Sequence, residues 1–275
     1  MSRNIRFILA GVLLIAGALV ACAPSAAPIP QITIKAHDYA FEGPSQINAG
    51  LVNIKLVNDG HEPHHAQLVR LNDDVTMEQL QKAMQENPES AVGLVTEAGG
   101  PSVVEPGQSG EVIVDLPSGQ YLLLCFIPSA DGVPHMVKGM IAPLTVTANT
   151  APAVSAPKEN LTVTMSDYAF AFSGAVKAGE QTWKVINNGP QPHEIALIKL
   201  TDGKTVEDAF AWFAAPSGPP PYQYAGGFQG IPTGKNGWVK LNLMPGTYVA
   251  VCAIPDTADG KSHAEHGMVL PFTVN

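Results

Sequence analysis

The chain repeats itself, and this duplication restricts its architecture more than any other feature of the sequence. Short motifs from the first half return in the second half in the same order, offset by 127 to 129 residues. The pairs are Asp38-Tyr-Ala-Phe41 with Asp167-Tyr-Ala-Phe170, Asn58-x-Gly-x-x-Pro-His64 with Asn187-x-Gly-x-x-Pro-His193, Gly99-Gly100 with Gly226-Gly227, Gly119-x-Tyr-x-x-x-Cys125-x-Ile-Pro128 with Gly246-x-Tyr-x-x-x-Cys252-x-Ile-Pro255, and His135-x-x-x-Gly-Met140 with His263-x-x-x-Gly-Met268. A collinear duplication of this kind predicts two copies of one domain.

The repeats divide the chain into two domains of ordinary size, at residues 31–148 and 160–275. Residues 149–159 are rich in Ala and Pro, which predicts a linker. The 275 residues include 26 Gly and 24 Pro, a proportion above average usage that favours many short strands and turns.

Segments of period-two alternation predict the strands of both domains. They are Gln31–Lys35, Val52–Leu56, Glu111–Asp115 and Leu144–Thr147 in the first repeat, and Asn160–Thr164, Thr182–Ile186, Trp238–Asn242 and Pro271–Val274 in the second. One helix per repeat is predicted after the capping signals Thr76-x-x-Gln79 and Thr205-x-x-Asp208. The predicted fold class is therefore all-β, with two tandem Greek-key β-sandwiches that each carry a short helical insertion.

Residues 1–21 are predicted to be a signal peptide. Arg3 and Arg6 precede the apolar run Phe7–Val20, which is too short for a comfortable membrane span. The run ends in Leu-Val-Ala-Cys22, which resembles the bacterial lipoprotein lipobox; the resemblance implies cleavage before Cys22 and acylation of its thiol. An ordinary secretory signal with a coincidental cysteine is the alternative. We expect residues 22–30 to be a tether and the protein to be extracytoplasmic, lipid-anchored to a bacterial membrane.

Charge and cysteine content exclude other classes. With 24 acidic and 15 basic residues the net charge is −9, and no basic cluster is present, so nucleic acid is not an expected partner. Three cysteines are too few for a disulfide scaffold. A bond between Cys125 and Cys252 is disfavoured, because the two occupy equivalent positions in separate domains.

Seven of the eight histidines lie near the repeated Asn-Gly motif or after the repeat's cysteine. They are His61, His64, His65 and His135 in the first repeat, and His193, His263 and His266 in the second. Each repeat therefore offers His, Cys, His and Met in that order. Two imidazoles and a thiolate in a plane, with a long axial Met, form the blue copper electron-transfer site.

At these residues the chain resembles two cupredoxin domains in tandem. Asn187-Asn-Gly-Pro-Gln-Pro-His193 resembles the upstream ligand strand of plastocyanin-like proteins, and Tyr121–Met140 is similar to the long ligand loop of copper nitrite reductases. The resemblance implies one copper ligand set in each repeat. The sets are His64, Cys125, His135 and Met140, and His193, Cys252, His263 and Met268.

The sequence leaves several assignments open. His61 and His65 compete with His64 for the upstream ligand position, and His266 competes with His263. The Cys-to-His gap is nine residues in the first repeat and ten in the second, longer than in plastocyanin-type loops. Ser217–Tyr224 is either a partner-docking segment or, as we favour, an irregular loop over one end of the domain.

The leading functional hypothesis is one-electron transfer through type 1 copper, with an unidentified redox partner protein. The alternatives are a copper-free cupredoxin scaffold for binding or structure, and copper storage or delivery without redox turnover. An enzyme is not expected, because Leu124 and Val251 precede the cysteines and no His-x-His pair is present to hold a second class of copper. An interface copper on His61, His65 and His266 is a weaker alternative.

Overall fold

A computed structural model describes residues 27–86 and 88–275. The first repeat contains β1 (Gln31–His37), β2 (Ala40–Glu42), β3 (Gln46–Asn48), β4 (Gly50–Asn58), β5 (Gln67–Leu71), α1 (Met77–Glu86), α2 (Pro88–Val92), β6 (Val95–Glu97), β7 (Ser109–Leu116), β8 (Gly119–Leu124) and β9 (Ile141–Thr147). The second contains β10 (Leu161–Ser166), β11 (Ala169–Phe172), β12 (Gly179–Asn187), β13 (His193–Leu200), α3 (Val206–Ala214), β14 (Tyr222–Ile231), β15 (Asn236–Leu243), β16 (Gly246–Val251) and β17 (Val269–Val274). Every predicted strand overlaps an observed one.

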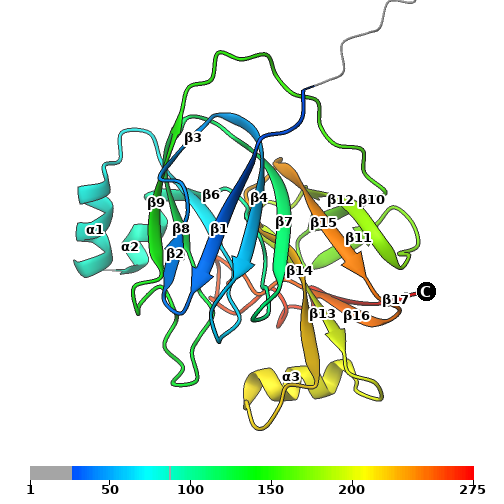
Figure 1. The fold of residues 1–275 in the computed structure, drawn as a ribbon. Coiled ribbons are helices and arrows are strands. Elements are labelled where there is room, and N and C mark those ends of the chain that lie inside the picture. Colours follow the sequence, from blue (N-terminus) through cyan, green and yellow to red (C-terminus); the bar gives the residue numbers. More distant parts are fainter. Residues whose placement is uncertain (1–26, 87) are drawn as a thin grey trace, which may run out of the picture.

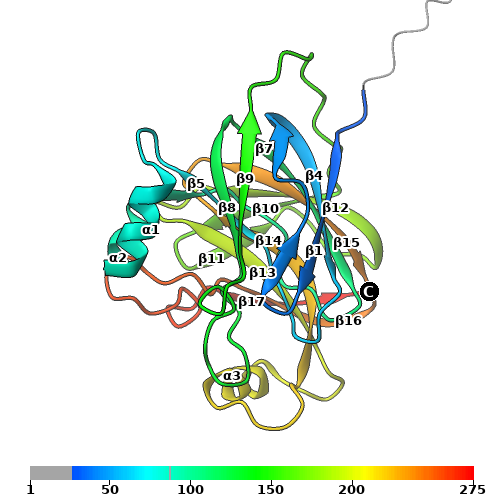
Figure 2. The same cartoon turned by 60° about the vertical axis from the view of Figure 1, so that its left-hand side comes forward.

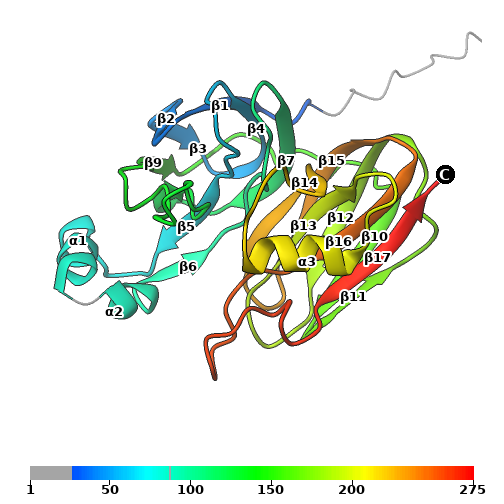
Figure 3. The ribbon, with the colours of Figure 1, turned by 90° about the horizontal axis from the view of Figure 1, so that it is seen from below.

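Each repeat folds into two sheets packed face to face, as Figure 3 shows from below. In the first repeat, β7-β4-β1-β2 faces β3-β9-β8-β5-β6; in the second, β11-β10-β12-β15 faces β14-β13-β16-β17. Alternation explains the packing: in β10, Leu161, Val163 and Met165 are buried while the threonines between them are half-buried. The all-β prediction is confirmed.

The helices lie against one sheet of each sandwich (Figures 1 and 2). Thr76 and Gln79 cap α1 reciprocally, and Thr205 and Asp208 form the equivalent capping box of α3. Leu80 of α1 packs with buried residues of β5 and β8. The first repeat differs from the prediction of one helix, since the short α2 follows α1.

The two sandwiches are joined through their edges, which the sequence did not predict. Strand β7 pairs antiparallel with β15, so that one eight-stranded sheet runs through both repeats. Val112 opposes its own repeat counterpart Val239, and Glu111 opposes Lys240. Pro101 likewise bridges to its counterpart Phe228. The repeats are therefore related across their interface as the halves of a two-fold dimer would be.

The repeated glycine pairs have a steric cause. Gly100 and Gly227 have φ values of 137° and 134°, and a Cβ on either would lie 2.0 Å from a backbone oxygen, that of Ala66 or of Ile195. Only glycine permits this approach. The segments that contain Gly100 and Gly227 can therefore pack directly against the backbone of Ala66 and Ile195, which follow the upstream histidines His64 and His193.

Candidate metal centres

The repeated asparagine fixes the loop that presents the upstream histidine. Asn58 is fully buried; its Nδ2 donates to the carbonyls of Glu62 and Val104, both at 2.8 Å, and its Oδ1 accepts from Gly60 N at 2.9 Å. Asn187 makes the equivalent three bonds. His64 is in turn held to Val104 by two backbone hydrogen bonds. The Asn-x-Gly-x-x-Pro-His motif is therefore a loop whose geometry is set by one amide side chain.

The cysteine loop folds back on itself at the end of β8. His135 N donates to the carbonyl of Ile127 at 2.9 Å, Met136 N to that of Cys125 at 2.8 Å, and Met140 N to that of His135 at 3.0 Å. The loop after β16 repeats these bonds around Cys252, His263 and Met268. Its extra residue lies within the outer hairpin, where Pro255 bridges to Ser262 as Pro128 does to Pro134. The two loops therefore make the same backbone hydrogen bonds around the cysteine, histidine and methionine, although their Cys-to-His gaps differ by one residue.

In both repeats two imidazole nitrogens and one sulfur converge. In the first repeat the Nδ1 atoms of His64 and His135 are 3.0 Å apart, and Cys125 Sγ lies 3.9 and 3.5 Å from them. In the second, the Nδ1 atoms of His193 and His263 are 3.0 Å apart, and Cys252 Sγ lies 3.9 and 3.4 Å from them. All six residues have zero exposure. We call these two groups site 1 and site 2.

Met140 and Met268 are also fully buried, in the core cluster that contains both cysteines. The competing histidines lie elsewhere. The side chain of His61 is 94% exposed and pairs with Asp38, and His65 Nε2 accepts the N–H of Phe126 at 2.7 Å.

His266 pairs with Asp259 at 3.1 Å and, with Asp256, forms a third group of possible metal-binding side chains. In the first repeat Lys138 and Asp131 form an ion pair of 2.8 Å at the equivalent place. The His266–Asp259 pair therefore corresponds to a contact that closes the ligand loop.

Carboxylates lie beside Nε2 of the upstream ligand histidines, the ring nitrogen that points away from the cysteine. The sequence analysis did not predict these contacts. Asp38 and Asp167 lie 3.3 and 2.8 Å from Nε2 of His64 and His193. Their positions begin the repeated Asp-Tyr-Ala-Phe motif, whose tyrosines Tyr39 and Tyr168 have positive φ values of 69° and 60°. The duplicated motif was a signal for these two acids.

The loop histidines differ in the carboxylate that lies nearest to them. Glu62 Oε2 lies 2.7 Å from His135 Nε2, whereas Asp256 Oδ2 lies 3.9 Å from His263 Nε2. Neither acid is repeated in the sequence, so no duplicated motif marks them. The Nε2 of His263 is buried and has no hydrogen-bond partner among the described residues.

Burial sets the protonation of the metal-free sites. It raises the pKa of the Cys125 thiol to about 11 and that of Cys252, where Glu194 adds to the effect, to about 12. Burial also lowers the pKa of His64 and His193, although the nearby aspartates oppose the shift. The neutral imidazole is the form that coordinates a metal.

The donor atoms fit a shared metal ion. A carboxylate lies beside Nε2 of each histidine in site 1, and the two Nδ1 atoms are 3.0 Å apart. When both imidazoles are neutral and donate from Nε2, their Nδ1 lone pairs face each other, and a shared metal ion would stabilise that arrangement. Atoms bound to one ion at about 2.0–2.3 Å are themselves about 3–4 Å apart, as found in both sites. Imidazole with thiolate and thioether is the donor set of blue copper, and Met140 and Met268 are buried in the same core as the cysteines.

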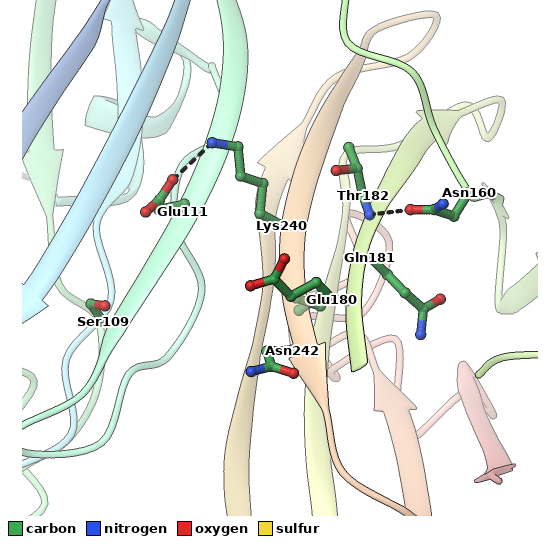
Figure 4. Close-up of a pocket in the computed structure, with 9 residues that line it drawn as sticks. Ser109, Glu111, Asn160, Glu180, Gln181, Thr182, Lys240 and Asn242 are labelled. Carbon is green, nitrogen blue, oxygen red and sulfur yellow. Dashed lines mark hydrogen bonds and ion pairs between the residues drawn. The ribbon is translucent and has the colours of Figure 1, made fainter. Parts of the chain in front are cut away.

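One groove of the described structure lies apart from these residues. A groove on the outer face of the joined sheet is lined by polar residues of β7, β12 and β15, including Glu111 and Lys240, whose ion pair of 2.9 Å crosses the interface (Figure 4). None of the eight predicted ligands lines it. In the segment Ser217–Tyr224, an irregular loop leads to the buried Tyr222, and Trp212 of α3 donates to the carbonyl of Gly218.

No protein-family model and no curated protein sequence matches the chain. Among solved structures, auracyanin B is 26% identical with a TM-score of 0.29, over 45% of this chain and 92% of that chain. Auracyanin A, a "blue" copper protein from Chloroflexus aurantiacus, is 20% identical with a TM-score of 0.30, over 44% and 100%. Copper nitrite reductase from Nitrosomonas europaea is 16% identical with a TM-score of 0.28, over 90% and 94%.

The strand topology and the two buried donor sets define the class of this protein. It consists of two cupredoxin-like domains in tandem, and each contains a His-Cys-His set that fits type 1 copper. The fold predicted from the sequence is therefore confirmed, and the donor sets fit the predicted copper.

The prediction that the chain is not an enzyme is wrong as an exclusion. The structures that match about nine-tenths of its length include a multicopper oxidase and a copper nitrite reductase, which are enzymes. The prediction relied on Leu124, Val251 and the missing His-x-His pairs. Motifs of this kind detect only metal ligands that are close together in the sequence, whereas the ligands of a second copper can also come from strands that are far apart in the chain.

Cys22 and the predicted signal peptide lie outside the described residues. In residues 27–86 and 88–275, no helix is long and apolar enough to cross a membrane.

Proposed function

We propose that the protein is an extracytoplasmic copper protein, held on a membrane through lipid at Cys22, that transfers single electrons through both domains. The observation that carries the proposal is the convergence of two imidazole nitrogens and a thiol sulfur in each repeat, all fully buried. Copper bound there would cycle between its two common oxidation states, with the soft sulfur favouring one and the imidazoles suiting both. The proposed ligands are His64, Cys125, His135 and Met140 in site 1, and His193, Cys252, His263 and Met268 in site 2.

The protein contributes rigidity and exclusion of water. The Asn58 side chain donates two hydrogen bonds and accepts one, which fixes the upstream ligand loop, and backbone bonds from His135 and Met140 fix the cysteine loop. Because both loops are anchored in the sandwich, the donor atoms are held in place whatever the charge at the site. Such preorganisation keeps structural change small on electron transfer.

Absorption spectroscopy of the copper-loaded mature protein tests the proposal. We expect an intense visible thiolate-to-copper band, reduced in Cys125→Ala and in Cys252→Ala and lost in the double variant. Cys22→Ser is the matched control, since it removes the third cysteine without touching either site. A colourless wild-type protein that takes up no copper would contradict the proposal and favour the copper-free scaffold.

Redox cycling separates electron transfer from copper storage or delivery. We expect the band to bleach and return reversibly at a defined potential with copper retained throughout. Loss of copper on each reduction would instead support storage or delivery.

The lipid anchor has its own test. We expect intact-mass analysis of protein from a bacterial host to show Cys22 at the N-terminus with an added acyl mass, and the protein to sediment with membranes. Cys22→Ser should move it to the soluble fraction, and an unmodified N-terminus at another residue would refute the anchor.

A further inference from the structure

The two sites obtain a carboxylate beside the loop histidine from opposite loops. Glu62 of the first repeat corresponds to Gln191 of the second, and Ser129 corresponds to Asp256. Each site thus has one acid and one neutral polar residue at this pair of positions, but the acid is on the upstream loop in site 1 and on the cysteine loop in site 2. Because the acid stands on a different loop in each site, different side chains donate hydrogen bonds to its carboxylate.

In site 1 the carboxylate binds the ligand directly. Glu62 Oε2 lies 2.7 Å from Nε2 of the fully buried His135 and also accepts from Ser129 Oγ at 3.0 Å. The Tyr39 hydroxyl is farther away, at 3.4 Å. The imidazole is therefore the closest donor to this charge.

In site 2 the carboxylate of Asp256 accepts its hydrogen bonds from neutral side chains other than the ligand histidine. Asp256 Oδ2 accepts from the Tyr168 hydroxyl at 2.5 Å and from Gln191 Nε2 at 2.8 Å. Its distance to His263 Nε2 is 3.9 Å, too long for a hydrogen bond. The imidazole of His263 is therefore without the direct anionic acceptor that His135 has.

The upstream histidines show a smaller difference in the opposite direction. Asp167 is 2.8 Å from His193 Nε2, and Asp38 is 3.3 Å from His64 Nε2, a difference of 0.5 Å. The loop-histidine distances of 2.7 and 3.9 Å differ by 1.2 Å, which separates a charge-assisted hydrogen bond from none. The balance places more negative charge on the ligands of site 1.

A carboxylate that accepts from the outer N–H of a ligand imidazole makes that imidazole a stronger electron donor and stabilises the more highly charged metal state. We propose that Glu62 makes site 1 the site of lower reduction potential, so that an electron shared between the two sites resides in site 2. The inference rests on the proposed function, and Glu62 is a positioning and tuning residue.

Single-site proteins test the inference. Cys252→Ala leaves only site 1 and Cys125→Ala leaves only site 2, and the potential of each is measured by redox titration of its visible band. We expect the equilibrium to favour the reduced form of site 2 over that of site 1 by tenfold or more, which is 59 mV for one electron. This comparison needs no substitution at Glu62 and so does not depend on how such a variant folds.

Exchanging the carboxylates tests the cause. In the Cys252→Ala protein, Glu62→Gln should raise the potential of site 1, and Glu62→Gln with Ser129→Asp should bring it close to that of site 2. In the Cys125→Ala protein, Gln191→Glu with Asp256→Ser should lower the potential of site 2. Glu78→Gln, which removes an exposed charge on α1, is the control and should change nothing.

The outcomes separate this inference from the proposed function. If both single-site proteins are coloured but their potentials differ by less than tenfold, or if Glu62→Gln has no more effect than Glu78→Gln, the inference is overturned while copper electron transfer stands. If neither protein forms a blue site, the proposed function itself fails.

Discussion

Gly189 lies directly against the imidazole of His193, so one added methyl group tests the geometry of site 2. A Cβ at this position would be 2.5 Å from His193 Nε2 and 2.9 Å from Asp167 Oδ1. The φ of Gly189 is not in the left-handed region, so alanine causes no backbone strain there. The conflict is therefore between side chains alone.

The required displacement can be worked out. An ordinary contact begins at 3.4 Å, so the ring must retreat by about 0.9 Å and the carboxylate by about 0.5 Å. Ligand positions must be correct to about 0.2 Å for a good metal site, so the expected shift is several times the tolerance. Overpacking of this kind also costs about 1–3 kcal/mol, or roughly 2–12 °C in Tm.

The assay uses the Cys125→Ala protein, in which site 2 alone reports. We expect Gly189→Ala to abolish or strongly shift the visible band and reduce the bound copper, while the metal-free protein still folds with a lowered Tm. Gly174→Ala is the matched control, because nothing lies within 4 Å of the added carbon. Full copper binding with an unchanged spectrum in Gly189→Ala would refute the assignment of His193 as a ligand.

Three further substitutions test the scaffold in the metal-free protein. Asn58→Ala removes three hydrogen bonds, two accepted by the carbonyls of Glu62 and Val104 and one donated by Gly60 N, so denaturant titration should show a loss of about 3 kcal/mol; a loss below about 1 kcal/mol would contradict the anchoring role. Leu80→Ala should cost about 2–5 kcal/mol in the same assay yet leave the visible band of the loaded protein unchanged, and a lost band would show that α1 supports the site. Burial would raise the pKa of Glu111, but hydrogen bonds from Asn53 and Lys240 outweigh it and lower the pKa. The charged Glu111 therefore contributes its full stabilisation to the fold above its ordinary pKa of 4.5, and this contribution is lost as the pH falls through the lowered pKa. Glu111→Gln should reduce the free energy of unfolding by about 0.5–1 kcal/mol at pH 7 and by progressively less in acid. A reduction that does not depend on pH would argue against the interface ion pair.

Local patterns were sufficient for most of the fold. Alternation located the strands because one face of each is buried, and the capping signals at Thr76 and Thr205 located α1 and α3. Periodicity says nothing about which strand edges meet. The pairing of β7 with β15 depends on the shape of two complete domains, so it could not be predicted.

The histidines and cysteines that converge could be predicted because duplication marks them. The order of His, Cys, His and Met recurs in both halves, and the repeated Asn-Gly motif distinguishes His64 from its neighbours. The carboxylates were harder. Asp38 and Asp167 recur as well, so the duplication marks them. Glu62 and Asp256 are not at equivalent positions of the repeats, and only the folded structure shows that each lies nearest to Nε2 of its loop histidine.

The sequence by itself determined the duplication, the strand pattern, the chemistry of the two donor sets and the order of their ligands, because each of these depends on residue type and local spacing. The tertiary structure decided which histidines converge with the cysteines, how the two sandwiches join into one sheet, and that His135 has a carboxylate partner that His263 lacks. These features depend on distances between side chains that are far apart in the chain, and such distances are set only when the loops close over the packed sheets.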